Sequence, residues 1–118
     1  MTLPSLLSLA IAPDHPVFAG HFPGHPIVPG ALLLDEAVQC LATAEGLDVL
    51  RLEVIVAKFL LPVRPGEALG LLFKCMAPGR YVLEIRASHD DAGMASETWR
   101  VAATATVILH DLLDQGDI

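Results

Sequence analysis

A histidine and a carboxylate stand fourteen positions apart in the first third of the chain, at His21 and Asp35. Gln39 follows the acid by four residues, so on a helix the two would share one face, where the amide can orient the carboxylate. In apolar surroundings a carboxyl group has its pKa raised by desolvation, which suits a general acid near neutral pH. His21 can act as the complementary base. These residue types predict an acid–base site.

Gly30 stands at the expected first turn of that helix, after a rigid loop rich in proline and glycine. Backbone N–H groups at a helix start lack intrahelical partners, and a glycine permits the close approach of a ligand. Such an N–H can stabilise a carbonyl oxygen that gains negative charge. Base, acid and oxyanion donor together describe proton abstraction beside a carbonyl with loss of a β-substituent.

Each of these residues also has a purely structural interpretation. His21 can be an ordinary loop histidine, Asp35 can accept a structural hydrogen bond, and Gly30 can relieve a tight turn. Glu36 competes for the role of acid, but it is turned by about 100° around the helix from Asp35. His25 has no carboxylate placed beside it by the pattern, and we interpret it as a loop residue.

The elements that would position these residues follow from the hydrophobic pattern. Residues 31–45 contain no proline or glycine and predict a helix of about four turns, with Gly46 as its stop. Apolar residues on every side of this segment predict a helix enclosed by other structure. The alternation of Leu7, Leu9 and Ile11 predicts an opening strand.

The pattern after the helix is that of strands. Runs at 52–60, 69–76, 81–87 and 97–109 are separated by turns at Pro65-Gly66, Pro78-Gly79 and residues 89–93. In the third run we expect one face to be buried and apolar, formed by Tyr81, Leu83, Ile85 and Ala87. In the last run we expect an apolar face formed by Trp99, Val101, Ala103, Ala105, Val107 and Leu109. The order of elements predicts one α+β domain over residues 1–118, in which an antiparallel sheet wraps one long central helix.

The composition restricts the classes of function. The net charge is −7 and the seven Lys and Arg residues are scattered, which disfavours a nucleic-acid partner. Hydrophobic residues make up 53% of the chain, more than one small monomer can hide, so self-association is expected. No apolar run is long enough to cross a bilayer, and the uncharged N-terminus argues against a cleaved signal peptide. Cys40 and Cys75 lack metal-ligand spacing, are expected in the core, and fit a reducing cytoplasmic location.

The segment GHFPGHPIVPGALLLDEAVQ at residues 20–39 resembles the active-site segment of the hot-dog-fold 3-hydroxyacyl-acyl-carrier-protein dehydratases. The pattern of that family is G-H-F-P-x-x-P, an aliphatic residue and x-P-G, then an acidic residue and a glutamine four further on. KFLLPVRPGEAL at residues 58–69 is similar to the family's strand and turn, F-x-x-P-V-x-P-G-D/E. The chain most resembles the short dehydratase-like proteins associated with aryl polyene and related specialised lipid pathways.

The resemblance implies that His21 is the base, that Asp35 is the acid held by Gln39, and that the Gly30 N–H polarises a thioester carbonyl. It also implies a homodimer in which the histidine and the acid of one site come from different subunits. Such dimers can assemble further into a higher oligomer. The substrate would be a 3-hydroxyacyl chain on the phosphopantetheine of an acyl carrier protein or of coenzyme A, with no metal or organic cofactor. Many members have Glu at the position of Asp35, and we do not infer from this difference that the new double bond is also isomerised.

We expect the acyl chain in an apolar tunnel beside the helix, in contact with residues of the facing strands and with Phe22, Pro29, Ala31, Leu32 and Leu33. Docking of an acidic carrier requires a local basic patch, for which the candidates are Lys58, Arg64 and Arg80. Two alternatives keep the fold: an acyl thioesterase that uses a carboxylate-activated water, and a non-catalytic acyl-binding subunit of a synthase. The intact set of candidate residues disfavours both.

Overall fold

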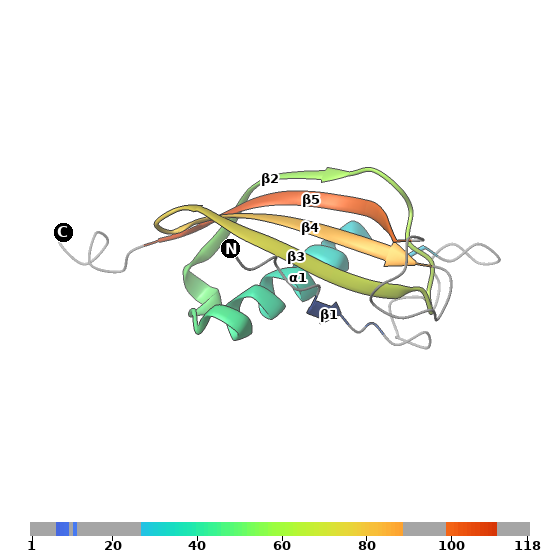
Figure 1. Ribbon diagram of the computed structural model, residues 1–118, viewed down its shortest axis with the longest axis horizontal. Coiled ribbons are helices and arrows are strands. Elements are labelled where there is room, and N and C mark those ends of the chain that lie inside the picture. Colours follow the sequence, from blue (N-terminus) through green and yellow to red (C-terminus); the bar gives the residue numbers. More distant parts are fainter. Residues whose placement is uncertain (1–6, 10, 12–26, 89–98, 111–118) are drawn as a thin grey trace.

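A computed structural model of the 118-residue chain describes residues 7–9, 11, 27–88 and 99–110. Its elements are β1 (Leu7–Leu9), α1 (Gly30–Glu45), the 3₁₀ turn η2 (Val49–Arg51), β2 (Leu52–Phe59), β3 (Ala68–Ala77), β4 (Arg80–Ser88) and β5 (Arg100–Leu109) (Figure 1). Every helix and strand expected from the sequence is present and overlaps its predicted range. His21 and Phe22 lie outside the described residues.

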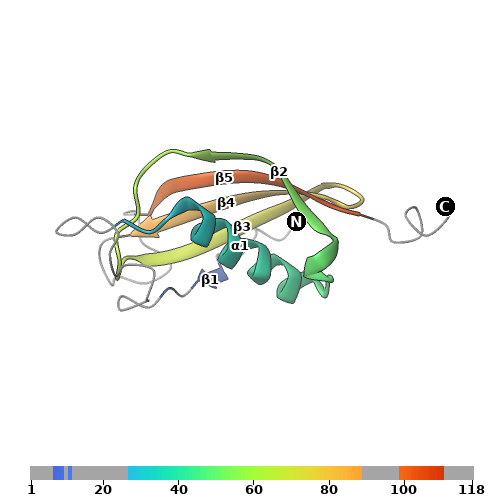
Figure 2. The same ribbon diagram turned by 180° about the vertical axis from the view of Figure 1, so that it is seen from behind.

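The five strands form one antiparallel sheet in the order β1-β3-β4-β5-β2. The helix α1 lies along one face of this sheet (Figures 1 and 2), which we call the inner face, and we call the opposite face the outer face. β1 and β2 are the two edge strands of the described sheet. The predicted architecture, an antiparallel sheet that wraps one long helix, is confirmed.

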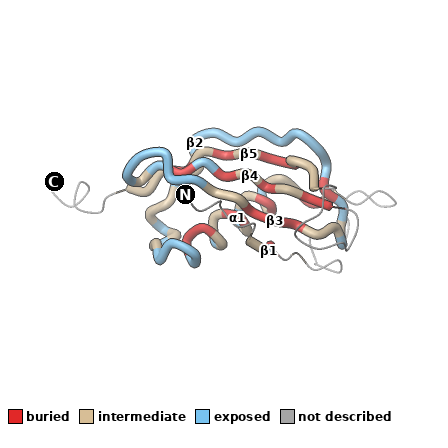
Figure 3. Tube along the Cα trace, viewed as in Figure 1, coloured by how far each residue is buried: buried red, intermediate tan, exposed pale blue. Residues whose placement is uncertain are grey.

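The core lies between α1 and the inner face of the sheet. Leu33, Ala37 and Leu41 form one buried stripe along the helix at intervals of four residues. Alternate residues of β4 face them as predicted, and their exposed fractions are at most 7%: Tyr81, Leu83, Ile85 and Ala87. Figure 3 shows this burial as red segments in the central strands and the helix. Removal of these apolar side chains from water holds the two layers together.

Two glycines with positive φ lie where the sequence predicts a helix stop and a turn. Gly46 has φ 66° and donates its N–H to the carbonyl of Ala42, which is the left-handed cap that ends α1. Gly66 has φ 88° and follows Pro65 in a turn where the N–H of Glu67 bonds to the carbonyl of Arg64 at 3.2 Å. Proline followed by a glycine with positive φ is typical of a type II turn. Both predicted stops are confirmed.

The expectation that α1 is enclosed on all sides is wrong for the single chain. Ala31, Asp35, Gln39 and Thr43 form an exposed stripe, four residues apart. One sheet covers one side of a helix, so apolar residues on the remaining sides do not by themselves place a helix inside its own chain. Within the described residues, no helix has the length and apolarity that a membrane span requires.

A β-bulge in β5 changes one predicted face. Ile85 registers with Ala103 and Arg86 with Val101, so Ala102 is the extra residue. Ala102 and Ala103 are both buried, and Val101 shares the outer face with Arg86. The predicted placement of Val101 on the face of Ala103 is therefore wrong, because a bulge reverses the alternation on one side of it.

The placement of the core predicts a contrast between two leucine truncations. Leu83 is 0% exposed and Leu50 is 90% exposed. Leu83→Ala should lower the free energy of unfolding by about 2–5 kcal/mol, because it leaves a cavity in the core. Leu50→Ala should change it by less than about 0.5 kcal/mol. Urea unfolding followed by circular dichroism measures both, and equal losses would contradict this core.

Candidate functional site

The first turn of α1 presents backbone donors. Gly30 is the first helical residue, and Pro29, with φ −58° and ψ 140°, is the N-cap. The Pro29 carbonyl accepts the N–H groups of Leu32 at 3.1 Å and Leu33 at 3.2 Å. The N–H groups of Gly30 and Ala31 come before this pattern and have no intrahelical acceptor, as at the start of any α-helix. Within the described residues no side chain caps the turn at Pro29, and the positive end of the helix dipole there can attract an oxygen of a ligand.

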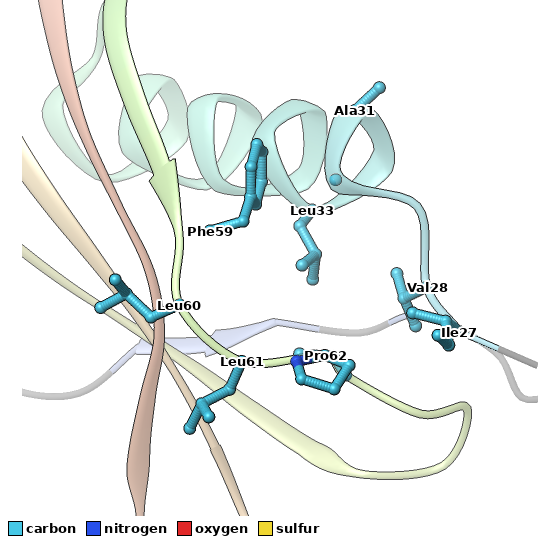
Figure 4. Close-up of a pocket in the computed structure, with 10 residues that line it drawn as sticks. Ile27, Val28, Ala31, Leu33, Phe59, Leu60, Leu61 and Pro62 are labelled. Atoms are coloured by element: carbon cyan, nitrogen blue, oxygen red, sulfur yellow. The ribbon is translucent and has the colours of Figure 1, made fainter.

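A cavity of about 520 Å³ lies beside this turn. The residues that line it are largely apolar and come from the segment before α1, the first turn of α1 and the end of β2 with the segment that follows: Ile27, Val28, Gly30, Ala31, Leu33, Phe59, Leu60, Leu61, Pro62 and Val63. Figure 4 shows Phe59 beside α1 and Leu33 pointing from the helix into the same space. This volume and lining fit an apolar group of a small ligand.

Gly30 lies against the ring of Phe59. A Cβ atom at position 30 would lie 2.7 Å from the Cε1 and Cζ atoms of that ring, so any larger residue requires the ring to move. Phe59 is 52% exposed, which leaves space for such a movement. The glycine therefore allows the end of β2 and the start of α1 to approach this closely.

The segment that follows β2 forms one wall of the cavity, and hydrogen bonds to two other parts of the chain hold it in place. The N–H groups of Leu60 and Leu61 donate to the carbonyl of Ala102 at 2.8 and 3.2 Å. Ala102 is the extra residue of the β5 bulge, so the bulge supplies the acceptor. The carbonyl of Val63 accepts the N–H of Val28 at 2.7 Å, which ties this wall to the segment before α1.

Glu67 fixes the far end of the same wall. Its Oε1 accepts the backbone N–H of Arg64 at 3.0 Å, and its Oε2 accepts Nη2 of Arg100 at 2.9 Å. The side chain of Glu67 is 5% exposed and that of Arg100 is 29% exposed. A carboxylate this buried needs such partners, so the ion pair holds the turn after Val63 on β5.

The residues predicted to contact substrate divide into three groups. Ala31 and Leu33 line the cavity together with Gly30. Pro29 is the N-cap and Leu32 packs against the core, and neither lines the cavity. Phe22 lies outside the described residues. The expected lining by facing strands is met by Phe59 at the end of β2. Residues 60–63 were not named in advance, although the unbroken apolar run after Lys58 is the signal that could have indicated them.

Asp35 and Gln39 lie on the exposed stripe of α1 and do not line this cavity. No hydrogen bond joins their side chains in the part of the chain that the structure describes, although their spacing places them on one side as expected. The expected burial of Asp35 is wrong for the single chain, because the sheet covers the opposite side of the helix. Glu36 is half-buried and faces β1, which separates it from Asp35.

A second cavity, of about 460 Å³, lies between α1 and β1 and is lined by Leu7, Ser8, Leu9, Glu36, Gln39, Cys40, Thr43 and Ala44. Burial and then the charge of Glu36 raise the pKa of the Cys40 thiol above its usual range. The thiol is therefore protonated near neutral pH and is a poor nucleophile. Cys75 was expected in the core but is exposed near the end of β3, where its Sγ donates to the carbonyl of Ala77 at 3.2 Å.

The three candidate docking residues are exposed and belong to three different parts of the fold. Lys58 registers with Thr104 near the end of β2, and Arg80 registers with Ile108 at the start of β4. Arg64 belongs to the turn that Glu67 closes and lies outside the strands.

The two Glu–Arg ion pairs allow a matched test of the cavity wall. Glu67→Gln should lower the free energy of unfolding by about 1–3 kcal/mol, because an amide nitrogen replaces one acceptor of a buried charged pair. Glu84 and Arg86 form the control pair at 2.6 Å, with side chains 31% and 38% exposed. Glu84→Gln should cost less than about 1 kcal/mol. Denaturant unfolding measures the loss of unfolding free energy in both variants. Equal losses would contradict the conclusion that the Glu67 ion pair holds the cavity wall.

The comparisons with known proteins agree on one family. A family model described as ApeI dehydratase, ApeI-like, matches residues 5–98. The 3-hydroxyacyl-acyl-carrier-protein dehydratase FabZ of Aliarcobacter butzleri is 41% identical over 71 residues, covering 50% of this chain and 48% of FabZ. FabZ of Wolbachia pipientis subsp. Culex pipiens is 37% identical over 90 residues, covering 69% of this chain and 63% of FabZ. The chain spans about half the length of the first of these curated relatives.

Two solved structures share the fold. An uncharacterized protein from Erwinia carotovora subsp. atroseptica has a TM-score of 0.65 at 22% identity, covering 95% of this chain and 99% of its own. The dehydratase heterocomplex ApeI:P from Xenorhabdus doucetiae has a TM-score of 0.62 at 19% identity, covering 93% and 100%. The single helix on an antiparallel five-stranded sheet is thus the hot-dog fold that the resemblance implied. On the match over residues 5–98, the chain belongs to the ApeI-like dehydratase family.

Proposed function

We propose that the protein is a hydro-lyase that removes water from a 3-hydroxyacyl thioester and forms the trans-2-enoyl thioester. In the proposed step His21 takes the proton from Cα of the substrate, and the electron pair of the broken Cα–H bond forms the Cα=Cβ double bond. The Cβ–O bond breaks, and Asp35 donates the proton with which the hydroxyl group leaves as water. The Gly30 N–H stabilises the negative charge that gathers on the thioester oxygen.

The observation that carries this proposal is the open first turn of α1 beside an apolar cavity. A thioester carbonyl at the N–H of Gly30 would place its acyl chain against Leu33 and Phe59. The helix dipole and the N–H act on the same oxygen, and they need no rearrangement as charge develops. This arrangement requires no metal or organic cofactor, and the proposal includes none.

The position of Asp35 supports a site that is completed by a second chain. Asp35 lies five residues after Gly30, about 7.5 Å along the helix axis, on the exposed stripe. We propose that the loop carrying His21 of a second copy covers this stripe. Such a contact would remove the carboxyl group of Asp35 from water, as a general acid near neutral pH requires.

The edge of β2 supports a homodimer. Ile55, Val56 and Phe59 are 40%, 50% and 52% exposed, which is unusual for a strand composed of such residues. Pairing of β2 with β2 of a second copy would satisfy the free backbone groups and extend the sheet in its own plane. The ApeI of Xenorhabdus doucetiae occurs in a heterocomplex, so a related chain is the alternative partner at this edge.

We propose an acyl carrier protein as the carrier of the substrate, by analogy with the FabZ relatives, and coenzyme A as the alternative. We also propose a cytoplasmic location, because both cysteines, Cys40 and Cys75, are free and a carrier-bound substrate is met there. An assay of carrier-bound 3-hydroxyacyl and 2-enoyl chains by mass spectrometry tests the reaction. Loss or gain of the mass of one water supports it, whereas release of free thiol would identify a thioesterase.

The role of the Gly30 N–H predicts different effects of two substitutions at one position. Gly30→Ala and Gly30→Pro both place a Cβ against Phe59, but only proline removes the N–H. Proline is well tolerated at the first position of a helix. Gly30→Pro should therefore lower kcat by about 10²–10³-fold relative to Gly30→Ala. Equal kcat values for the two variants would exclude this N–H as the oxyanion donor.

The shared site predicts complementation between two inactive variants. His21→Ala and Asp35→Asn should each lower kcat by at least about 10²-fold. Heterodimers made by refolding a mixture of the two contain one intact site, so the mixture should recover roughly a quarter of the wild-type activity. Activity is read by the same mass-spectrometric assay, and size-exclusion chromatography confirms dimers. Failure of mixed dimers to recover activity would place both residues of a site in one subunit.

A further inference from the structure

The cationic residues of the chain are concentrated on the outer face of the sheet. Seven Lys and Arg residues are present in a chain of net charge −7. Four of them belong to strands of the sheet and lie on its outer face: Lys58, Lys74, Arg80 and Arg86. We call these four residues and the side chains between them the cationic face.

The strand register establishes that these side chains share one face. Lys58 registers with Thr104, which registers with Glu84, and Lys74 registers with Val82. Residues paired in this way point to the same side of a sheet. Their neighbours along the strands, such as Leu83 and Ala105, are buried against α1, so the paired set points outward. By strand spacing, the Cα atoms of the four cations lie within roughly 20 Å of one another.

Three of the four cations have no ion pair in the described part of the chain: Lys58, Lys74 and Arg80. The two acidic residues that the described strands place on this face both have partners. Glu84 pairs with Arg86 at 2.6 Å, and Glu53 contacts Nε2 of His110 at 2.7 Å. The face therefore presents net positive charge on an acidic protein.

The opposite side of the molecule has the opposite charge. Residues 30–50, which include α1, contain four acidic residues and no Lys or Arg: Asp35, Glu36, Glu45 and Asp48. An approaching acidic protein is repelled by the helix side and attracted by the outer face, so charge alone orients its docking.

Exposed apolar side chains share this face with the cations. Val82 of β4 and Val56 of β2 both register with Thr106 and are 36% and 50% exposed. Cations beside exposed apolar side chains match a protein surface on which acidic and apolar residues also lie side by side. A second copy packed face to face would bring unpaired cations together, and three unpaired cations on an acidic chain are too few for a nucleic acid.

From this distribution we infer that the cationic face docks the acidic acyl carrier protein. The inference rests on the proposed function, which supplies a carrier-bound substrate. Lys58 immediately precedes Phe59 and Leu60, which line the cavity at Gly30, so the cationic face meets the cavity at the end of β2. Pairing of two copies through β2 extends the sheet in its plane and leaves this face open. Arg64, in contrast, belongs to the turn between β2 and β3 and not to the strands that carry the cationic face.

Binding of an apo acyl carrier protein, which has no phosphopantetheine arm, tests the inference apart from the active site. The dissociation constant is measured by fluorescence anisotropy of the labelled carrier at two ionic strengths. Lys58→Glu and Lys74→Glu should each weaken binding at least roughly tenfold, and the effect should shrink as salt rises. Arg64→Glu makes the same change of net charge outside the face and should weaken binding less than about twofold.

A carrier-free substrate separates this inference from the proposed function. Dehydration of a 3-hydroxyacyl pantetheine thioester should proceed equally in the wild type, Lys58→Glu and Lys74→Glu. If the wild type fails to dehydrate it and also fails on carrier-bound substrates, the proposed function is wrong, while the binding measurement still decides the docking surface. Wild-type carrier affinity in both face variants would overturn the inference. So would an equal loss in Arg64→Glu, or a change of oligomer size in the face variants without a change in carrier binding.

Discussion

The packing of α1 on the inner face of the sheet is the interaction on which the rest of the structure depends. Small side chains on both layers, among them Ala37 of the helix and Ala103 of β5, are fully buried, which lets helix and sheet approach closely. Leu33 and Leu41 extend the same stripe in both directions. Once this stripe is in place, the direction of the helix is set. Its first turn must then lie at the end of β2, where the cavity forms.

Local signals explain why the elements could be predicted from the sequence. Gly46 and the Pro65-Gly66 pair act within a few residues, and the conformations they require are those found. The alternation in β4 was equally informative, because one face of that strand is dry and the other is not. Such features do not depend on distant parts of the chain.

The features that escaped prediction depend on tertiary contacts. The bulge at Ala102 lies in a run of alanine and threonine that fits either register, so no periodicity could locate it. The exposure of Asp35 depends on which side of α1 the sheet covers, and apolar periodicity on all sides leaves that open. The lining of the cavity by Leu60 and Leu61 follows from the acceptor that the bulge provides.

The two sides of α1 thus differ in burial and in polarity. Toward the sheet it is apolar and closed, with Gly30 at the edge of the cavity, whereas the far side carries Asp35 and Gln39 on an exposed stripe. In the proposed mechanism, Asp35 acts on a group bound at Gly30 after a second chain has covered the exposed stripe, because the sheet of the same chain packs on the other side of the helix. The exposed apolar edge of β2 lies beside the cavity and is the surface by which a second chain would arrive there. The exposed acid and the exposed apolar edge of β2 both lie on surfaces that the single chain leaves uncovered, and this supports the proposed pairing of two chains across β2.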